Sequence, residues 1–500
     1  MAQQFSRGKT DSLTDLRPFH PVEKAMGLAV DRMANFRITF FQSQLLLAIV
    51  DTLLVLAASL AARWLARVYP IADLDITEAD MAIRSMSWYR ILVLLSAWHL
   101  FGWLNDLYDI SAYPTKRLII VRILSVGLFS ALGSMLVALP FRLPLPVAFP
   151  LYFLCIGLPL VIVWRLTCVA LSRTSICSRR ILILGKGNRA QAAANLLTTP
   201  RGLNYQVLGY VSEKPDASLT EHDGLPVWEM STGLVNLTRR LRADEIVVAL
   251  DGALERNLFE DLLTCRENGT RVLSFPDLYG KLSRKVPVEY VEPAWVLEAI
   301  QSASSRWQRI CKRLLDLTVC LLALPWFLLL FPMIAVAIKL NSPGPVFYRQ
   351  LRSGLRGKPF RILKFRTMYT DAEKDGKPRW ATQDDPRITR VGYYLRKLRL
   401  DELPQVFNVL RGEMSLIGPR PERPEFVEEL EKVIPYYRTR LLVKPGLTGW
   451  AQINYRYGNT VDDALTKLQY DIHYVRHWSL WLDIYILFHT VSVVLGAHGT

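Results

Sequence analysis

The sequence predicts a membrane protein in which a bundle of membrane-spanning helices precedes a parallel α/β domain. Three observations support this fold class. Hydrophobic residues make up 51% of the 500 residues, a high share for a soluble chain of this length. Long apolar runs occupy the first third of the chain. Short buried-strand patterns then alternate with helical patterns between residues 180 and 300.

The charge balance and the cysteines indicate which partners to expect. The formal net charge of +16 favours anionic partners. Lipid headgroups and nucleotide phosphates fit better than nucleic acid, which would have to bind beside several membrane spans. The six cysteines form no C-x-x-C pair and no cluster with metal-ligand spacing. We therefore expect membrane lipids as partners, no nucleic acid, and a reduced, cytosol-facing chemistry.

Four apolar segments predict a four-helix transmembrane bundle over residues 41–175, after a cytoplasmic tail at residues 1–40. The first segment is expected to act as an uncleaved anchor. Each segment approaches the ~20 residues needed to cross the hydrocarbon core, the second only marginally. The segments cover roughly residues 44–64, 88–104, 118–139 and 146–166.

The distribution of charge around these segments predicts their orientation. Cations flank the ends that a four-pass topology places in the cytoplasm, whereas the first outer loop carries Asp73 and Asp75. By the positive-inside rule, both ends of the bundle face the cytoplasm. Asp51 lies inside the first span, where we expect an interhelical hydrogen bond rather than a catalytic role. The flanking cations are Arg7, Lys9, Arg17, Lys24, Arg32, Arg37, Lys116, Arg117, Arg165, Arg173, Arg179 and Arg180.

Residues 176–300 predict a Rossmann-like cytosolic domain. Gly185-Lys-Gly-Asn-Arg-Ala190 follows the first expected strand, so the glycines could place a pyrophosphate on a helix N-terminus or could form only a tight turn. We favour a structural or regulatory module. NAD is not expected here, because the Tyr-x-x-x-Lys pair Tyr210 and Lys214 lies at a strand end. The expected strands cover residues 181–184, 205–211, 245–250 and 271–275.

A fifth apolar segment differs from the others because cations flank both of its ends. Residues 317–338 carry no charge and are long enough to span, but Pro325 lies in the middle. A proline inside a helix removes a backbone hydrogen bond and clashes with the previous turn. We therefore expect a reentrant hairpin over about residues 310–340, bent at the structural kink Pro325. A kinked fifth span, which would place residues 340–500 outside, is the alternative.

The last third of the chain combines clusters of cations with an acidic pair. Seven cations and no acid occur between Arg349 and Arg366, and five cations and no acid between Arg387 and Arg399. Such clusters suit phosphate oxygens, and they also suit an anionic lipid surface. Asp401-Glu402 follows the second cluster directly.

The acidic pair has two interpretations. Because Pro404 is tolerated only in the first turn of a helix, Asp401 could be an N-cap, with both acids paired to Lys397 or Arg399. Alternatively, the Asp401 carboxylate is a nucleophile that attacks phosphorus and splits one displacement into two easier ones.

Six motifs in this region give the chain a specific resemblance. The region resembles the monotopic phosphoglycosyl transferases that begin bacterial polysaccharide synthesis, within the bacterial sugar transferase family. The preceding spans and α/β domain resemble the long members, of undecaprenyl-phosphate glucose or galactose phosphotransferase type. The motifs are Ser342-Pro-Gly-Pro-Val-Phe347, Lys364-Phe-Arg-Thr-Met368, Leu400-Asp-Glu-Leu-Pro-Gln405, Ser415-Leu-Ile-Gly-Pro-Arg-Pro421, Lys444-Pro-Gly-Leu-Thr-Gly-Trp-Ala-Gln452 and Trp478-Ser-Leu-Trp-Leu-Asp483.

The resemblance implies an α-rich catalytic domain over residues 301–500 and a role for each matching residue. Asp401 would attack the β-phosphate of a UDP-sugar and release UMP, and undecaprenyl phosphate would then take the sugar phosphate from the aspartyl intermediate. Glu402 would assist the second step, and Mg²⁺ (or Mn²⁺) would bind near Asp401 and Glu402. The substrate- and phosphate-binding residues would be Lys364, Arg366, Arg396, Arg399 and Arg420.

The resemblance also implies a setting and leaves rivals open. The enzyme would lie in the bacterial inner membrane with its catalytic domain on the cytoplasmic face, and would prime exopolysaccharide, capsule or O-antigen synthesis. Glucose is expected slightly ahead of galactose, with an N-acetylated sugar as a further alternative. The additional domains offer surface for a homodimer. The rivals are a membrane-tethered nucleotide-sugar dehydratase or epimerase and a non-catalytic scaffold of polysaccharide assembly.

Two further features near the C-terminus invite interpretation. His473 and His477 lie one helical turn apart without an evident third ligand, so we interpret them as interfacial side chains rather than metal ligands. Trp478 and Trp481, with the apolar run to Leu495, predict a membrane-surface helix with aromatic anchors.

Overall fold

The computed structural model forms two compact units that divide near Arg180. The predicted tail at residues 1–40 lies outside the described residues, as do Asp73, Asp75, Arg173 and Lys214. The structure describes residues 44–68, 76–109, 116–136, 148–172, 178–199, 205–212, 221–230, 233–301, 305–370, 372, 385–455, 458 and 460–495.

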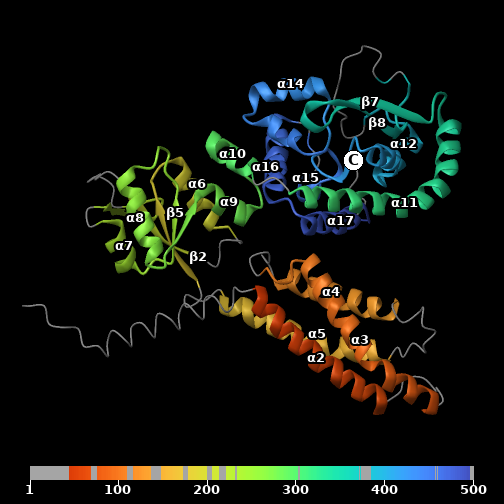
Figure 1. Cartoon of the computed structure of the whole chain (residues 1–500), viewed down its shortest axis with the longest axis horizontal. Coiled ribbons are helices and arrows are strands. Elements are labelled where there is room, and N and C mark those ends of the chain that lie inside the picture. The colour runs from red at the N-terminus through yellow and green to blue at the C-terminus, as the bar shows by residue number, and fades with distance from the viewer. Residues whose placement is uncertain are drawn as a thin grey trace, which may run out of the picture. The chain divides into compact units, whose positions relative to one another are not determined.

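The described part of the first unit is a bundle of four helices that coincide with the four predicted segments (Figure 1). Helices α2, α4 and α5 are long and apolar enough to cross a membrane, whereas the apolar part of α3 is shorter, at Tyr89–Leu104. Together with the apolar helix Arg306–Asn341 of the second unit, they make the chain a membrane protein. The helices are α2 (Gln44–Val68), α3 (Ile76–Leu104), α4 (Lys116–Leu136) and α5 (Ala148–Ser172).

A buried ion pair joins α2 to α5. The Arg165 guanidinium donates a 2.6 Å hydrogen bond to the Asp51 carboxylate, and the two side chains are 2% and 0% exposed. The interhelical bond expected for Asp51 is therefore present. The position expected for Arg165 was wrong, because it lies inside α5 and not beyond it. An apolar bundle tolerates this cation because the partner carboxylate compensates its charge.

The α/β domain of the second unit contains a six-stranded sheet of order β3-β4-β2-β1-β5-β6. Strand β1 pairs with β5, β5 with β6 and β2 with β4 in parallel, whereas β3 and β4 pair antiparallel. The predicted parallel sheet is thus confirmed, while β3 and β4 were not expected. The strands are β1 (Arg179–Leu184), β2 (Tyr205–Ser212), β3 (Glu221–His222), β4 (Leu225–Glu229), β5 (Glu245–Val248) and β6 (Arg271–Ser274).

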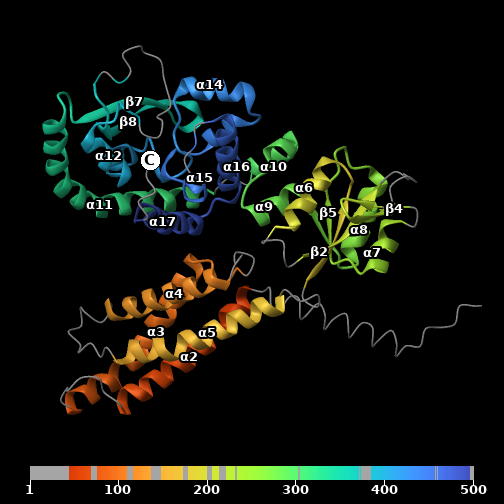
Figure 2. The same ribbon diagram turned by 180° about the vertical axis from the view of Figure 1, so that it is seen from behind.

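Helices cover both faces of this sheet, as Figures 1 and 2 show from opposite sides. Helices α6 (Asn188–Leu197) and α9 (Phe275–Ser283) lie on one face, and α7 (Leu234–Leu241) and α8 (Arg256–Glu267) on the other. Both faces of β1 are therefore buried. This explains why Ile181, Leu182, Ile183 and Leu184 form an unbroken apolar run with no exposed surface.

The glycine-rich loop after β1 makes a tight turn closed by the protein's own carboxylate. Gly185 has a φ of +118°, and a Cβ there would lie 2.5 Å from the Ala249 carbonyl oxygen. Asp251 follows β5 and accepts hydrogen bonds from the amides of Asn188 (3.0 Å) and Arg189 (3.3 Å). The amides that would hold a phosphate are thus engaged, which favours the structural interpretation of the glycines.

Helix α11 (Arg306–Asn341) opens the C-terminal domain and contains both Pro325 and Pro332. It turns partway along its length in Figure 1. Near its start, Arg313 donates to the Val409 carbonyl oxygen at 2.6 Å. At its end, Asn341 accepts from the Val391 amide at 3.1 Å. A straight helix of 36 residues would be ~54 Å long, so the turn allows both ends to contact one domain.

The C-terminal domain packs short strands among helices, with α17 (Leu480–Leu495) beside α11. Asp483 is fully buried and accepts from Lys312 (2.8 Å), Tyr474 (2.8 Å) and Trp478 (3.0 Å). Trp478 is partly buried against this core, and its role as an interfacial anchor stays a prediction. Trp481 is 62% exposed and remains a candidate anchor.

Candidate active site

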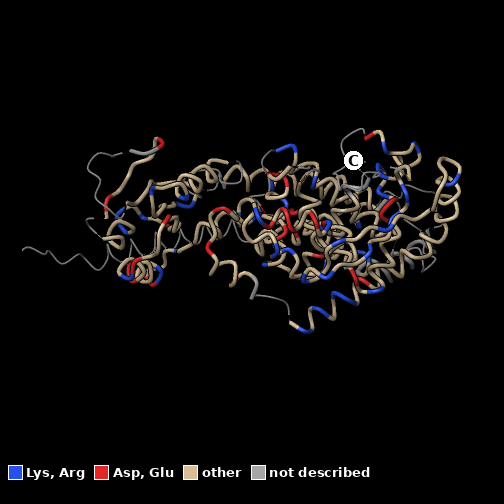
Figure 3. The backbone as a smooth tube through the Cα atoms, turned by 90° about the horizontal axis from the view of Figure 1, so that it is seen from above, with Lys and Arg blue, Asp and Glu red and all other residues tan. Residues whose placement is uncertain are grey.

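A cavity of about 530 Å³ lies within the C-terminal domain and is lined by every substrate-binding and catalytic residue that the sequence predicted. Figure 3 shows Lys and Arg spread through this part of the chain. Among the described residues, three acids line the cavity: Asp401, Glu402 and Glu422. The cations are Arg352, Lys364, Arg366, Arg387, Arg396, Arg399, Arg420, Arg423, Arg440 and Lys467. The excess of positive charge suits a phosphorylated ligand.

An antiparallel hairpin forms one wall of the cavity. Strands β7 (Phe347–Ser353) and β8 (Pro359–Phe365) pair so that Tyr348 lies opposite Lys364, and both side chains line the cavity. The outer edge of β8 is closed by Asn408. Its carboxamide accepts from the Leu363 amide (3.0 Å) and donates to the Arg361 carbonyl oxygen (2.8 Å).

The acidic pair lies on a 3₁₀ helix, η7 (Leu400–Gln405), which continues into α13 (Val406–Arg411). Arg399, in the left-handed region at φ +55°, precedes η7 as its N-cap. The alternative in which Asp401 is an N-cap was therefore wrong. Pro404 lies inside the short 3₁₀ helix rather than in the first turn of an α-helix. The turn at Arg399 directs both carboxylates into the cavity.

Two cations hold Glu402. Its Oε1 accepts from Lys364 Nζ at 2.9 Å and from Arg420 Nη2 at 2.7 Å, and it is 7% exposed. These partners replace the Lys397 or Arg399 pairing that the capping interpretation expected. Burial would raise the pKa of this carboxyl, but Arg420 and Lys364 together hold it well below its usual range. Glu402 is therefore ionised and fixed.

Asp401 has the opposite environment. It is 8% exposed, and among the described residues none forms a hydrogen bond or an ion pair with its carboxylate. Burial first, and the adjacent charge of Glu402 second, raise its pKa above that of an ordinary aspartate, although Lys364, Arg396 and Arg420 oppose the shift. A buried carboxylate without a fixed partner beside several cations can attack an electrophilic phosphorus.

The other predicted cations occupy two kinds of position. Arg396 lies on α12 (Arg390–Lys397) and donates to the Thr367 hydroxyl at 3.0 Å, which places its guanidinium along the cavity wall. Gly392 allows this approach, because a Cβ there would overlap the Thr367 carbonyl oxygen. Arg366 instead donates to the carbonyl oxygens of Pro343 and Ser342, both at 2.7 Å. It thus ties the end of α11 to β8.

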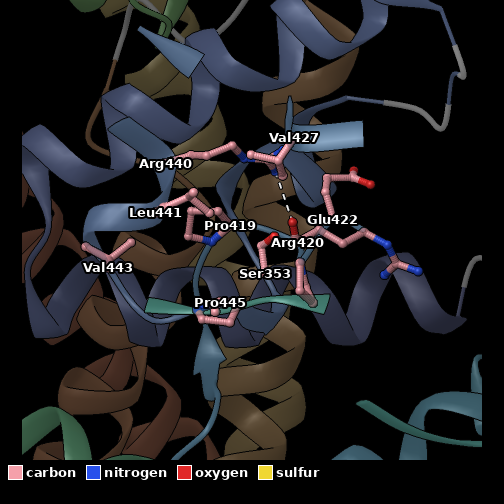
Figure 4. A pocket seen from close by; sticks show the side chains of 11 residues that line it. Ser353, Pro419, Arg420, Glu422, Val427, Arg440, Leu441, Val443 and Pro445 are labelled. Carbon is pink, nitrogen blue, oxygen red and sulfur yellow. Dashed lines mark hydrogen bonds between the residues drawn. The ribbon is translucent and has the colours of Figure 1, made fainter. Parts of the chain in front are cut away.

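Sequence reasoning missed Arg440, which supports the loop that carries Arg420. Figure 4 shows Arg440 reaching the backbone of this loop, while the Arg420 side chain extends away from it. The Arg440 guanidinium donates to the Arg420 carbonyl oxygen at 3.0 Å and lies 2.9 Å from the Asp471 carboxylate. Asp471 is 31 positions further along the chain, and no local pattern marks the pair.

The described acids of the cavity do not by themselves form a metal cage. No group of three or more His, Cys, Asp or Glu that could hold a metal occurs in the described parts of the chain. Mg²⁺ keeps several waters and binds through one or two carboxylates together with substrate phosphates. The available Asp401 carboxylate fits that mode. Glu402, already held by two cations, fits it less well.

Known proteins match two regions of the chain. Residues 307–497 match the bacterial sugar transferase family, and residues 104–276 match a family described as a CoA-binding domain. A UDP-glucose:undecaprenyl-phosphate glucose-1-phosphate transferase of Xanthomonas campestris pv. campestris is 35% identical over 64% of this chain and 67% of its own length. The chain belongs to the bacterial sugar transferase family.

Two other relatives match a smaller share of their own length. An undecaprenyl-phosphate glucose phosphotransferase of Komagataeibacter xylinus is 36% identical over 63% of this chain and 59% of its own. A UDP-N-acetylgalactosamine-undecaprenyl-phosphate N-acetylgalactosaminephosphotransferase of Aeromonas hydrophila is 47% identical over 38% of this chain and 44% of its own. The chain thus spans less than two thirds of the length of these two relatives.

The family match confirms the resemblance drawn from the six motifs, all of which lie within residues 307–497. The second match runs through the α/β domain and agrees with the predicted parallel sheet.

Proposed function

We propose that the chain transfers a sugar 1-phosphate from a UDP-sugar to undecaprenyl phosphate and releases UMP, through a covalent aspartyl phosphosugar. The observation that carries the proposal is the contrast within the acidic pair: Glu402 is held by two cations, whereas Asp401 is buried without a partner among the described residues. Relatives named for this transfer support the choice of donor and acceptor.

In the first step an Asp401 carboxylate oxygen attacks the β-phosphorus of the donor. The new bond is an acyl phosphate, and the bond from this phosphorus to the bridging oxygen breaks, so that UMP leaves with that oxygen. Lys364, Arg396 and Arg420 would stabilise the charge that builds up on the phosphoryl oxygens. Because Glu402 fixes Lys364 and Arg420 beforehand, these donors need not reorganise during the reaction.

In the second step a phosphate oxygen of undecaprenyl phosphate attacks the same phosphorus. The acyl phosphate bond breaks, the Asp401 carboxylate is regenerated, and undecaprenyl diphosphosugar leaves. Mg²⁺ or Mn²⁺, when bound beside Asp401, would shield the charge of the diphosphate.

The acceptor is a membrane lipid, so the site must open at a membrane surface. We propose that α11 enters the membrane as a reentrant hairpin, with its bend at Pro325. Its outward face is apolar, with Leu322, Trp326 and Met333 each 69% exposed, while both of its ends contact the catalytic domain. The cavity would then face the cytoplasm of the bacterial inner membrane, where nucleotide sugars occur.

The proposed transfer would be the priming step of exopolysaccharide, capsule or O-antigen synthesis. We propose glucose as the sugar, with galactose as the alternative, because two of the three relatives described above are named for glucose. A homodimer is compatible with this assignment and is not required by it.

The test is UMP release from a panel of UDP-sugars by the full-length protein, with Mg²⁺ and undecaprenyl phosphate. We expect UMP from one sugar, and a loss of at least about 10³-fold in Asp401→Asn. Release of UDP would indicate an ordinary glycosyltransferase. Release of no nucleotide from any sugar would favour a scaffold.

A further inference from the structure

A short segment that follows α9, near the end of the α/β domain, lies against the outside of the catalytic cavity's wall. We name residues 284–289 the brace. The brace follows α9, and its first residue, Arg284, lies in the left-handed region at φ +58°. A non-glycine residue seldom adopts this conformation unless its surroundings hold it there. Here the Arg284 amide donates to the Gly280 carbonyl oxygen at 2.9 Å as the C-cap of α9, and the catalytic domain binds the Arg284 carbonyl oxygen.

The brace binds α16 (Val461–His477) through Gln469. The Val286 amide donates to the Gln469 carbonyl oxygen at 3.0 Å. The Gln469 carboxamide in turn donates to both carboxylate oxygens of Glu289, at 3.2 and 3.1 Å. Val286 and Val288 are each 1% exposed and share one apolar cluster with Leu468 and Ile472 of α16. The brace is thus part of the catalytic domain's core.

The brace also binds α15 (Trp450–Asn454) through a single indole. Trp450 Nε1 donates to the Arg284 carbonyl oxygen at 3.1 Å, and Trp450 is 3% exposed. His473 of α16 stacks on the same indole, with ring centroids 5.8 Å apart. Burial, together with the nearby charges of His477, Arg284 and Arg476, lowers the pKa of His473 to about 3, so the stacked ring is neutral.

The two helices that the brace contacts also line the cavity. Ala451 and Gln452, which follow Trp450 directly, belong to the lining, as do Ala464 and Lys467 of α16. Each helix therefore has one side against the brace and another against the cavity. A shift of the brace would move a wall of the substrate site without touching Asp401 or Glu402.

We propose that the brace is a positioning element for the donor substrate: through Trp450 and Gln469 it holds the α15–α16 wall of the cavity in place for the UDP-sugar. This inference rests on the proposed function. It gives the segment that leads from the α/β sheet into the catalytic domain a role in donor binding that does not require a ligand of its own.

The first test compares two Trp→Phe variants of the full-length protein. Trp450→Phe keeps a ring but removes the indole donor to Arg284. Trp228→Phe removes an equivalent 3.1 Å bond, from Trp228 Nε1 to the Leu208 carbonyl oxygen, within the α/β domain. With UDP-glucose and undecaprenyl phosphate, we expect Trp450→Phe to raise KM for the donor about 5- to 10-fold, with a smaller fall in kcat. Trp228→Phe is expected to leave KM unchanged.

The second test exchanges the partners at the other end of the brace. Gln469→Glu places a carboxylate against Glu289, and the repulsion should raise KM for UDP-glucose. Adding Glu289→Gln restores a carboxamide-to-carboxylate bond with its direction reversed, so we expect the double variant to regain most of the wild-type KM. A purely structural role would change the thermal midpoint of these variants without this reciprocal pattern in KM.

The outcomes of the two tests distinguish a failure of the brace proposal from a failure of the proposed function. The brace proposal would be overturned if Trp450→Phe and Trp228→Phe had the same KM for UDP-glucose. It would also be overturned if the double variant had a KM as high as that of Gln469→Glu alone. A wild-type protein that releases no UMP would overturn the proposed function on which the inference rests.

Discussion

Glu402 and Arg420 form an ion pair in the candidate active site, with Arg420 Nη2 2.7 Å from Glu402 Oε1. Arg420 arrives on the loop after β9 (Ser415–Ile417), and Arg440 holds the backbone of that loop. The contact therefore joins two of the family's motifs across the cavity. Among the described acids of the cavity, it leaves Asp401, the neighbour of Glu402, without a fixed partner.

The first prediction concerns Arg420→Ala. The variant should lower kcat/KM for UMP release about 10²-fold, because one preorganised donor to the phosphoryl oxygens is lost. Steady-state kinetics with varied UDP-glucose measure the change. Arg438→Ala is the control, since that arginine pairs with Glu431 and is 65% exposed. Equal activity in the two variants would remove Arg420 from the site.

The second prediction concerns pH. Asp401 must be ionised to attack, and its pKa is raised, so kcat/KM should fall with decreasing pH earlier than for an ordinary aspartate. Arg420 is one of the cations that lower this pKa. Arg420→Ala should therefore raise it further and move the acid limb to higher pH. If the acid limb of the kcat/KM profile of Arg420→Ala stays in place, or moves to lower pH, this account of Asp401 is contradicted.

Much of this organisation could be predicted from the sequence because the signals are local. Apolar runs and strand patterns depend on neighbouring residues, and the cation clusters and acidic pair lie within 70 positions. Arg165 was expected after the fourth span because the end of a span was set at the first cation. Its buried partner Asp51 lies 114 positions away, so no local pattern shows that the cation belongs inside the helix. Arg440 and Lys467 escaped notice for the same reason, since only the fold brings them to the cavity.

The third prediction concerns the hairpin that carries Lys364. Asn408 has no exposed surface, and its carboxamide bonds to the backbone at Leu363 and Arg361. Asn408→Ala leaves those groups unsatisfied and should lower the free energy of unfolding by about 1–3 kcal/mol. Thermal unfolding in detergent measures it. The control is Asn454→Ala, which removes one bond at an exposed side chain. Equal midpoints would show that Asn408 does not support the hairpin.

The fourth prediction concerns the ion pair of the helical bundle. Arg165→Leu leaves the Asp51 carboxylate buried without its partner, which should destabilise the bundle by about 3–5 kcal/mol. The double variant Asp51→Leu/Arg165→Leu removes both charges and should recover most of that loss. The yield of folded protein in detergent and its thermal midpoint measure both. A double variant less stable than Arg165→Leu would contradict the pairing.

The most direct test of the central claim is to trap the covalent intermediate. Wild-type protein is incubated with Mg²⁺ and UDP-glucose labelled with ³²P in its β-phosphate, without undecaprenyl phosphate, and the labelled peptide is identified. We predict label on the peptide that contains Asp401, none in Asp401→Asn, and its release on addition of undecaprenyl phosphate. Label on another residue, or UMP formed only when lipid is present and without protein labelling, would contradict a nucleophilic role for Asp401.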